Sequence, residues 1–441
     1  MVGMAVLMTV TSTAAMKVDT SMAAMTMRLR RGDRPAGAVP GGTIGLGCVA
    51  LMASYKGFAD RRSTQFGGGP AWRRLTGLPL PDAFPWNQAG QPLPLTPCLP
   101  NPVQGELRAA DPAIEVHGDV LYNPVQDHLW HDDPLWGTYN LSGYLIDAAA
   151  YYRGPGKATV GQSPWVDRSA IPAVDAPDET YIYGGTLIEH FGHFLLSSLS
   201  RFWPFADDAL RASLGPHRIL CHGVFGPDHW WGFDYMRASL LALGIPHGRL
   251  VCFPHPVRVR RLIVPRLSFE EYSFVHAAYT RLTRHVGARL GPAAPGGCGP
   301  AYLSRSAYPR ISQGFDNEAE LEAVLAALGV EVIRPEALAL ADQAAVFARR
   351  RVVLGTISSA FHAAVLAPCT GTSILLSPTH IPGPNFGMLD RAFGFDARYV
   401  HAPCTLLGVG EGGRMGSRFR LDDPAATARE LLAMVQAACN T

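Results

Sequence analysis

The sequence predicts an α/β protein in which two doubly wound, Rossmann-like domains face a cleft, preceded by a loop-rich N-terminal extension. From Glu179 onward, short apolar runs alternate with amphipathic segments, the pattern of a parallel sheet with crossover helices. A Gly/Pro-rich stretch, GPAAPGGCGP at residues 291–300, divides this series in two and is typical of a linker. The chain of 441 residues is also too long for one ordinary core.

These observations define four segments. We expect residues 1–60, rich in Met, Ala and Thr, to be disordered or to precede the true translation start. We expect residues 61–290 to form the N-terminal α/β domain, with a Pro-, Gly- and Trp-rich edge up to about residue 175. Residues 291–300 form the linker, and residues 301–441 form the C-terminal Rossmann-like domain.

The elements before the linker follow from their apolar spacing and their end signals. TYIYGG (180–185) is β-rich, and the next segment, EHFGHFLLSSLSRFWPFAD (189–207), repeats its apolar residues at helical spacing. Further strands are expected at 217–223, 249–253 and 259–265, and a helix at 233–245 that Gly244 ends.

The elements after the linker form a cleaner series. A helix at 315–329 has Asp316 or Asn317 as its N-cap and Gly329 at its end. The other expected helices are 339–350, 358–367 and 424–438, and the expected strands are 301–305, 330–334, 351–355, 372–377 and 397–402.

Composition excludes several classes of protein. A net charge of +2 gives no electrostatic basis for nucleic-acid binding. No two of the eight cysteines form a C-x-x-C pair, so neither a zinc ribbon nor a disulfide framework is indicated. The apolar run GTIGLGCVALMA (42–53) is interrupted by glycine and is shorter than the roughly 20 residues that cross a bilayer, and no other run reaches that length. We therefore expect a protein in the cytoplasm, or peripheral to the inner face of the membrane.

Two histidines stand out in the helix predicted at 189–207. His190 and His193 share one face with Ser197 and Arg201, while Ile188, Phe191, Leu195, Leu199 and Phe202 form the opposite, apolar face. A metal site needs a third and fourth ligand, and the only other dense cluster is HLWHDD (128–133). We expect no metal. The histidines face either solvent or the cleft.

The C-terminal domain has features of an anion site. The strand at 351–355 ends at Gly355, and the following helix begins near Ser358 and Ser359, where free N–H groups attract phosphate. Arg305 and Arg310 follow the strand at 301–305, where open α/β sheets bind ligands. The alternatives are an ordinary serine-capped helix and solvated loop arginines.

Other nucleotide-binding motifs are missing from the sequence. There is no G-x-G-x-x-G at a strand–helix junction and no Walker A motif, and GVGEGG (408–413) opens no evident helix. A dinucleotide-dependent oxidoreductase is therefore the least favoured class.

There is also no D-x-D pair to hold Mg²⁺ on a nucleotide sugar, so phosphate would be neutralised by arginines and helix dipoles. Glu336, after the strand at 330–334, is placed to accept ribose hydroxyls or is an ordinary first-turn carboxylate.

Four segments follow one another in this order: EHFGHFLLSSLSRFW, VRRLIVP, YLSRS and NEAELEAVLAALGVEVIRPEALALADQAAVFARRRVVLG. Together they resemble glycosyltransferase family 61, the DUF563 type, over Glu179–Ser377. The resemblance implies a GT-B fold and inverting, metal-independent transfer. It implies a nucleotide-sugar donor on the C-terminal domain and a glycan acceptor on the N-terminal domain. Arg305, Glu336 and the 355–362 turn, which includes His362, fall on the family's donor motifs, and His193 falls on the Gly-His of its first motif.

The resemblance implies that His193 acts as the base on the acceptor hydroxyl, with His190 beside it and Glu189 and Asp207 as reserve bases. The sequence departs from the family in two places: GTISSAFH replaces a Gly-Pro-His-Gly-Ala-Gly-type run, and Ser197 and Ser198 stand where an acidic residue is usual. We expect a role in surface or capsular polysaccharide synthesis. A polysaccharide pyruvyl transferase-like enzyme and a degenerate, non-catalytic nucleotide-sugar- or glycan-binding protein are the alternatives.

Overall fold

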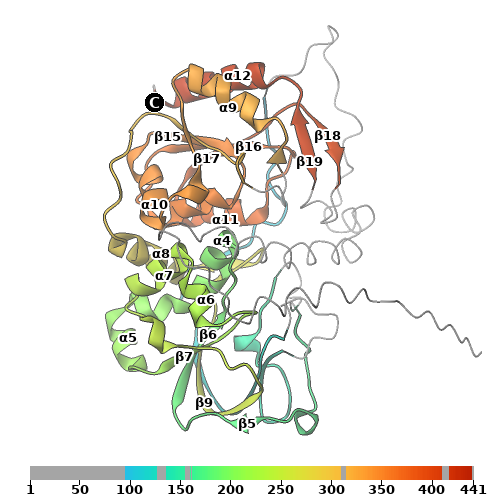
Figure 1. Cartoon of the computed structure of the whole chain (residues 1–441), viewed down its shortest axis with the longest axis vertical. Coiled ribbons are helices and arrows are strands. Elements are labelled where there is room, and N and C mark those ends of the chain that lie inside the picture. Colours follow the sequence, from blue (N-terminus) through green and yellow to red (C-terminus); the bar gives the residue numbers. More distant parts are fainter. Residues whose placement is uncertain are drawn as a thin grey trace, which may run out of the picture. The chain divides into compact units, whose positions relative to one another are not determined.

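The computed structural model describes residues 95–126, 136–153, 159, 161–308, 314–409 and 417–439 (Figure 1). The expectations for residues 1–60, for the HLWHDD cluster (128–133) and for Arg310 lie outside these ranges, as does most of GVGEGG (408–413). Within the described ranges the chain is a mixed α/β protein with several mostly parallel sheets, which confirms the predicted class. The domain boundaries stay a prediction.

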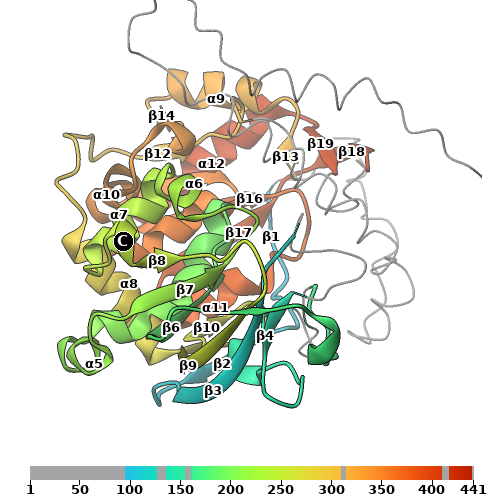
Figure 2. The same ribbon diagram turned by 60° about the horizontal axis from the view of Figure 1, so that its bottom comes forward.

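The first sheet has seven strands in the order β4-β3-β9-β6-β7-β8, with β5 pairing on β9. Strands β9, β6, β7 and β8 are mutually parallel, whereas β3 pairs antiparallel with β9, and β4 pairs antiparallel with β3. Figure 2 shows β3, β9 and β6 side by side. Their bounds are β3 Ile114–Asn123, β4 Gly137–Tyr139, β5 Val174–Asp175, β6 Thr180–Thr186, β7 Arg218–His222, β8 Leu250–Val251 and β9 Val257–Pro265.

The second sheet has six strands in the order β1-β17-β16-β15-β12-β14, and all pairs but β1–β17 are parallel. Its five parallel strands follow the doubly wound order 2-1-3-4-5, in which the connections reverse direction between β12 and β15. The bounds are β1 Thr96–Pro97, β12 Ala301–Leu303, β14 Glu331–Ile333, β15 Val352–Thr356, β16 Thr372–Ser377 and β17 Asp396–His401.

Two small sheets complete the strand list. One has the order β10-β11-β2, with β2 Glu106–Arg108, β10 Phe269–Glu270 and β11 Phe274–His276. The other has the order β13-β19-β18, with β13 Gly314–Phe315, β18 Cys404–Gly408 and β19 Arg418–Leu421. The turn between β10 and β11 carries Glu271.

The longer helices are α5 Asp208–Leu214, α6 Pro227–Trp231, α7 Asp234–Ala242, α8 Ala277–Arg289, α9 Glu318–Ala327, α10 Leu340–Arg349, α11 Pro384–Phe393 and α12 Pro424–Cys439. Of these, α7, α9, α10 and α12 lie at predicted positions. The segment predicted as a helix at 358–367 is a 3₁₀ helix, η7 (Ser359–Leu366). Helices α5, α6, α8 and α11 were not predicted.

The helix expected at 189–207 is not uniform. It begins as α4 (Phe191–His193), continues as one π-helical segment, η3 (Phe194–Ser198), and ends as a 3₁₀ helix, η4 (Leu199–Ala206). Pro204 lies inside η4 and cannot donate an α-helical hydrogen bond. Single π-helical turns in an otherwise regular helix are frequent at functional sites.

Both faces of this helical segment are buried. His193 is 7% exposed, Ser197 7% and Arg201 4%, so the solvent-facing alternative for the polar face is wrong. The largest core cluster contains side chains from helices on both sheets, among them Phe202, Leu282, Phe361 and Met388. The part of the chain before residues 291–300 (the first half) and the part after them (the second half) therefore pack directly on one another at α4, α8, α11 and η7.

No helix in the described part of the chain is both long and apolar enough to cross a membrane.

Candidate active site

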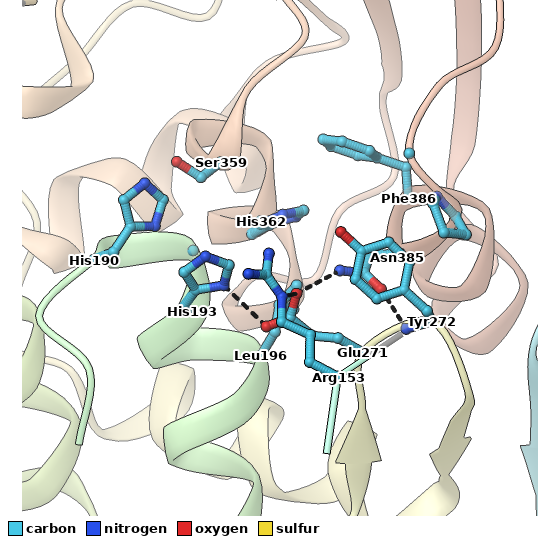
Figure 3. Close-up of a pocket in the computed structure, with 13 residues that line it drawn as sticks. Arg153, His190, His193, Leu196, Glu271, Tyr272, Ser359, His362, Asn385 and Phe386 are labelled. Carbon is cyan, nitrogen blue, oxygen red and sulfur yellow. Dashed lines mark hydrogen bonds and ion pairs between the residues drawn. The ribbon is translucent and has the colours of Figure 1, made fainter. Parts of the chain in front are cut away.

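A cavity of about 160 Å³ lies where α4, the β10–β11 turn, η7 and α11 meet (Figure 3). His190 and His193 line it from the first half, and Ser359 and His362 line it from the second. The structure therefore brings together four residues that the sequence analysis selected from segments about 170 positions apart. Its volume is close to the roughly 150 Å³ that holds a benzene-sized guest, so one ring of a ligand fits.

His193 is held by a carboxylate that the sequence analysis did not select. Its Nδ1 lies 2.9 Å from Oε1 of Glu271, in the turn between β10 and β11. When Nδ1–H donates to this carboxylate, the lone pair of the neutral imidazole is on Nε2. This is the arrangement in which a histidine is oriented to accept a proton from a hydroxyl group.

Glu271 is itself enclosed by donors. Oε1 accepts a hydrogen bond from Ser197 Oγ at 2.6 Å, and Oε2 accepts from Arg153 Nε at 3.3 Å and from Asn385 Nδ2 at 3.1 Å. Burial on its own raises the pKa of Glu271, but the charges of Arg153 and His193, together with these hydrogen bonds, hold it well below the ordinary value. The group is a fixed carboxylate.

The departure in the first motif lies next to this carboxylate. Ser197, one of the two serines at the place where the resemblance implies an acidic residue, donates its hydroxyl to Glu271. The carboxylate is therefore present beside His193, but it comes from a turn 78 positions away in the chain. No periodic pattern marks Glu271, Arg153 or Asn385. The only local signal is a Glu-Glu pair, Glu270-Glu271, inside the apolar context SFEEYSF.

The two halves touch at a glycine. A Cβ built on Gly192 would lie 2.7 Å from Cβ of Ser359 and 3.4 Å from Cδ2 of His362. Only glycine allows α4 and η7 to approach this closely. Burial lowers the pKa of His362 to about 4, so it is a neutral imidazole near pH 7. Its Nδ1 has no hydrogen-bond partner among the described residues.

His190 and the reserve bases differ in position. The His190 ring lies 4.8 Å from that of His193 and faces the cavity, and burial, followed by the charge of His193, lowers its pKa well below the ordinary value. Glu189 is not among the residues that line the cavity, and its Oε1 accepts from Trp230 Nε1 at 3.2 Å. Asp207 caps α5 by accepting from the Leu210 N–H at 2.9 Å, which is a structural role.

Glu189 makes stability depend on pH. Burial raises its pKa from 4.5 to about 7, so between these values the folded chain holds a proton that the unfolded chain releases. The free energy of unfolding therefore falls as the pH rises from 4.5 to 7, and it does not recover above pH 7. We expect Glu189→Gln to raise the stability at pH 8 by up to about 3 kcal/mol and to change little at pH 4.5.

Thermal unfolding of wild type and Glu189→Gln across pH 4.5 to 8 measures this difference. Glutamine keeps an oxygen that accepts from Trp230 and removes only the titration. If the unfolding temperatures of the two proteins differed by the same amount at every pH, Glu189 would be ionised in the folded state, which would contradict the expectation.

The predicted donor residues surround the point where the second sheet reverses its connections. Arg305 follows the carboxyl end of β12; burial lowers its pKa, and the charge of Glu318 opposes that shift. Ser358 precedes η7 at the carboxyl end of β15, and its Oγ is buried without a partner in the described structure. Glu336 lies in the short 3₁₀ turn Pro335–Ala337 and is exposed.

Gly355 has a packing role in the structure. It lies within β15, and a Cβ there would meet the Leu303 carbonyl oxygen of β12 at 2.7 Å. Beside it, Tyr302 and Thr356 donate to the buried Glu318 at 2.7 Å and 2.8 Å, which joins the ends of β12 and β15 to α9. These bonds position the loops in which Arg305 and Ser358 lie.

Arg201 connects the elements around the cavity. Its guanidinium donates to the carbonyl oxygens of Ala148 and Ala150 and to that of Pro265, at 2.5 to 3.0 Å. The first two precede Arg153, and the third precedes the turn that carries Glu271. The helix of His193 is thereby joined to both segments that complete its hydrogen-bond network.

No group of three or more His, Cys, Asp or Glu side chains in the described residues is arranged to hold a metal ion. The cluster at the cavity has three histidines, but His193 Nδ1 is committed to Glu271.

A comparison with protein-family models identifies the domain in which these residues lie. The model of the family Glycosyltransferase 61 matches residues 191–375. These residues form a glycosyltransferase 61 domain. The match confirms the resemblance, and such a domain implies that the protein is a glycosyltransferase. No curated protein matches the chain.

The glycosyltransferase 61 domain includes His193, Glu271 and His362, whereas Arg153 and Asn385 lie outside the matched range. The carboxylate–histidine pair is therefore internal to the domain. The residues that neutralise and orient Glu271 are supplied by flanking segments.

Proposed function

We propose that the protein is an inverting, metal-independent glycosyltransferase that moves a sugar from a nucleotide-sugar donor to a glycan acceptor. The observation that carries the proposal is the buried His193–Glu271 pair, which faces a cavity shared with η7 inside a glycosyltransferase 61 domain. In this proposal the two sheets correspond to the two halves of a GT-B fold. The first half holds the acceptor and the second holds the donor.

The donor assignment rests on the strand order of the second sheet. Open α/β sheets bind ligands at the carboxyl ends of the strands where the connections reverse, here between β12 and β15. Arg305 is at one of these ends and Ser358 at the other. An arginine, an unpartnered buried hydroxyl and the amino end of η7 together suit the diphosphate of a nucleotide sugar.

The chemical step follows from these positions. The acceptor hydroxyl oxygen forms a bond to the anomeric carbon as the bond from that carbon to the diphosphate oxygen breaks. Nε2 of His193 takes the hydroxyl proton, and the Glu271 carboxylate stabilises the resulting imidazolium. Arg305 and the N–H groups of η7 stabilise the negative charge that develops on the leaving diphosphate. Attack from the face opposite the leaving group inverts the anomeric configuration.

The biological setting is also a proposal. We place the enzyme in the synthesis of a surface or capsular polysaccharide, in the cytoplasm or at the inner face of the membrane. The glycosyltransferase 61 domain supports a sugar donor and a sugar-accepting partner, and the weak net charge of +2 gives no support for a nucleic-acid partner.

Donor binding is tested by thermal shift against a panel of UDP-, GDP- and CMP-sugars in EDTA. At least one compound should raise the unfolding temperature of the wild type, because binding to the folded state alone stabilises it. Arg305→Ala should weaken that binding roughly 10- to 100-fold, the effect of losing a charge-assisted hydrogen bond.

Arg398→Ala is the matched control, since Arg398 is a partly exposed arginine of the same sheet that pairs with Asp396. It should retain the full shift. No shift with any compound would count against the proposed function, and an unchanged shift in Arg305→Ala would remove Arg305 from the donor site.

A further inference from the structure

Tyr272, next to Glu271 in the β10–β11 turn, has an unusual backbone conformation. Its φ is +67°, a left-handed value that bulky residues rarely adopt because Cβ crowds the backbone. Among the described non-glycine residues, the other one with positive φ is Asp119, a short polar residue that tolerates this region. Nine glycines occupy the remaining positive-φ positions in the described ranges, so local preference favours glycine at 272.

The second half of the chain holds this conformation. The Tyr272 N–H donates to Asn385 Oδ1 at 2.9 Å, and Nδ2 of the same amide donates to Glu271 at 3.1 Å. A glycine makes the same backbone hydrogen bond without the crowding. What tyrosine adds at this position is therefore its ring. Strained residues of this kind cluster at functional sites.

The Tyr272 ring lies on the cavity wall, as does that of Phe386 (Figure 3). Polar groups surround the same space: Arg153, His193, Ser359, His362 and Asn385. Aromatic faces with polar groups at their edges match a pyranose ring, which presents C–H bonds on its faces and hydroxyl groups at its rim. The cavity of about 160 Å³ accommodates one such ring.

We propose that Tyr272, together with Phe386, forms a subsite that stacks on the acceptor's terminal pyranose ring and presents its hydroxyl to His193. The inference rests on the proposed function and adds where the acceptor binds. Tyr272 belongs to the same turn as Glu271, the partner of the proposed base, whereas the proposed nucleotide site lies at the ends of β12 and β15. We assign the ring to the acceptor because the acceptor hydroxyl is the group that must reach His193, which Glu271 holds.

Saturation-transfer NMR with methyl glycosides of glucose, galactose, mannose and xylose tests the subsite directly. In the wild type, the ring C–H protons of at least one glycoside should receive saturation. Tyr272→Phe should retain binding, since it keeps the ring. Tyr272→Gly should weaken binding about tenfold, the upper range for one aromatic contact, while its unfolding temperature stays equal or rises because the crowding is relieved. Tyr144→Ala is the control, because Tyr144 is 58% exposed and does not line the cavity.

The outcomes separate this inference from the proposed function. Equal glycoside binding by Tyr272→Gly and wild type would overturn the subsite. No glycoside binding by wild type, with nucleotide sugars still raising its unfolding temperature, would overturn the subsite and leave the proposed function standing. A Tyr272→Gly variant that loses nucleotide-sugar binding but keeps glycoside binding would show that the ring contacts the donor, which also contradicts the inference.

Discussion

We expect His193→Ala to lower sugar transfer roughly 10²- to 10⁴-fold, the usual contribution of a general base, and to leave donor binding unchanged. The reason is that His193 is the proposed proton acceptor, whereas the proposed donor residues belong to the second sheet. Product formation measured against donor-induced thermal shift separates the two effects. His117→Ala is the matched control, because His117 also pairs with a glutamate, Glu115, at 3.0 Å but on the half-exposed β3.

Glu271→Gln tests the His193–Glu271 pair from the side of the carboxylate. The amide is nearly the same shape, but its N–H group favours the tautomer with the lone pair on Nδ1 of His193. Transfer should fall roughly 10²- to 10⁴-fold, as it does when a catalytic histidine is held in the wrong tautomer. The variant must be shown to be folded, since Arg153 then keeps a buried charge without its carboxylate. Transfer at the wild-type rate in folded His193→Ala would exclude His193 as the base.

Gly287→Ala has the largest expected effect on stability. Gly287 lies inside α8, and a Cβ there would be 1.7 Å from the Leu366 carbonyl oxygen at the end of η7. The Leu366 carbonyl oxygen belongs to the backbone, so it can move away from this Cβ only if α8 and η7 separate. We expect a loss of roughly 3 kcal/mol or more in the free energy of unfolding, above the usual range for overpacking.

Gly387→Ala provides the contrast for this prediction. Gly387 is also inside a helix, α11, but nothing lies within 4 Å of a Cβ built on it. Alanine should stabilise there by up to about 1 kcal/mol, because it is the better helix former. Urea unfolding of the two variants measures both changes. Similar stability of Gly287→Ala and wild type would mean that α8 and η7 do not pack as closely as described.

The sequence predicted the alternation of strands and helices because that information is local. Every strand predicted after the linker is present, and Gly329 ends α9 as expected from its spacing. Helix α11 was missed because Pro384 and Gly387 suggest a loop. Proline is nevertheless compatible with the first helical position, where its missing N–H is not needed.

The site itself could be predicted only in part. His193, Ser359 and His362 were selected because they lie in motifs at the ends of predicted elements. Glu271 was not, because its importance depends on a contact with His193 over 78 positions, which no local pattern encodes. The same holds for Asn385, whose amide contacts Glu271 from 114 positions away. The polar face of the helix was predicted, but its burial follows from contacts with η7, with Glu271 and with the carbonyl groups that Arg201 binds.

The central claim is tested most directly by measuring nucleotide release from a panel of nucleotide sugars by wild type and His193→Ala, with methyl glycosides as acceptors and excess EDTA present. Acceptor-dependent release of a nucleotide by the wild type, and its loss in His193→Ala, is the result that we expect. Release that requires an added divalent cation, or that is equally fast in His193→Ala, would contradict a metal-independent transfer in which the His193–Glu271 pair removes the acceptor proton.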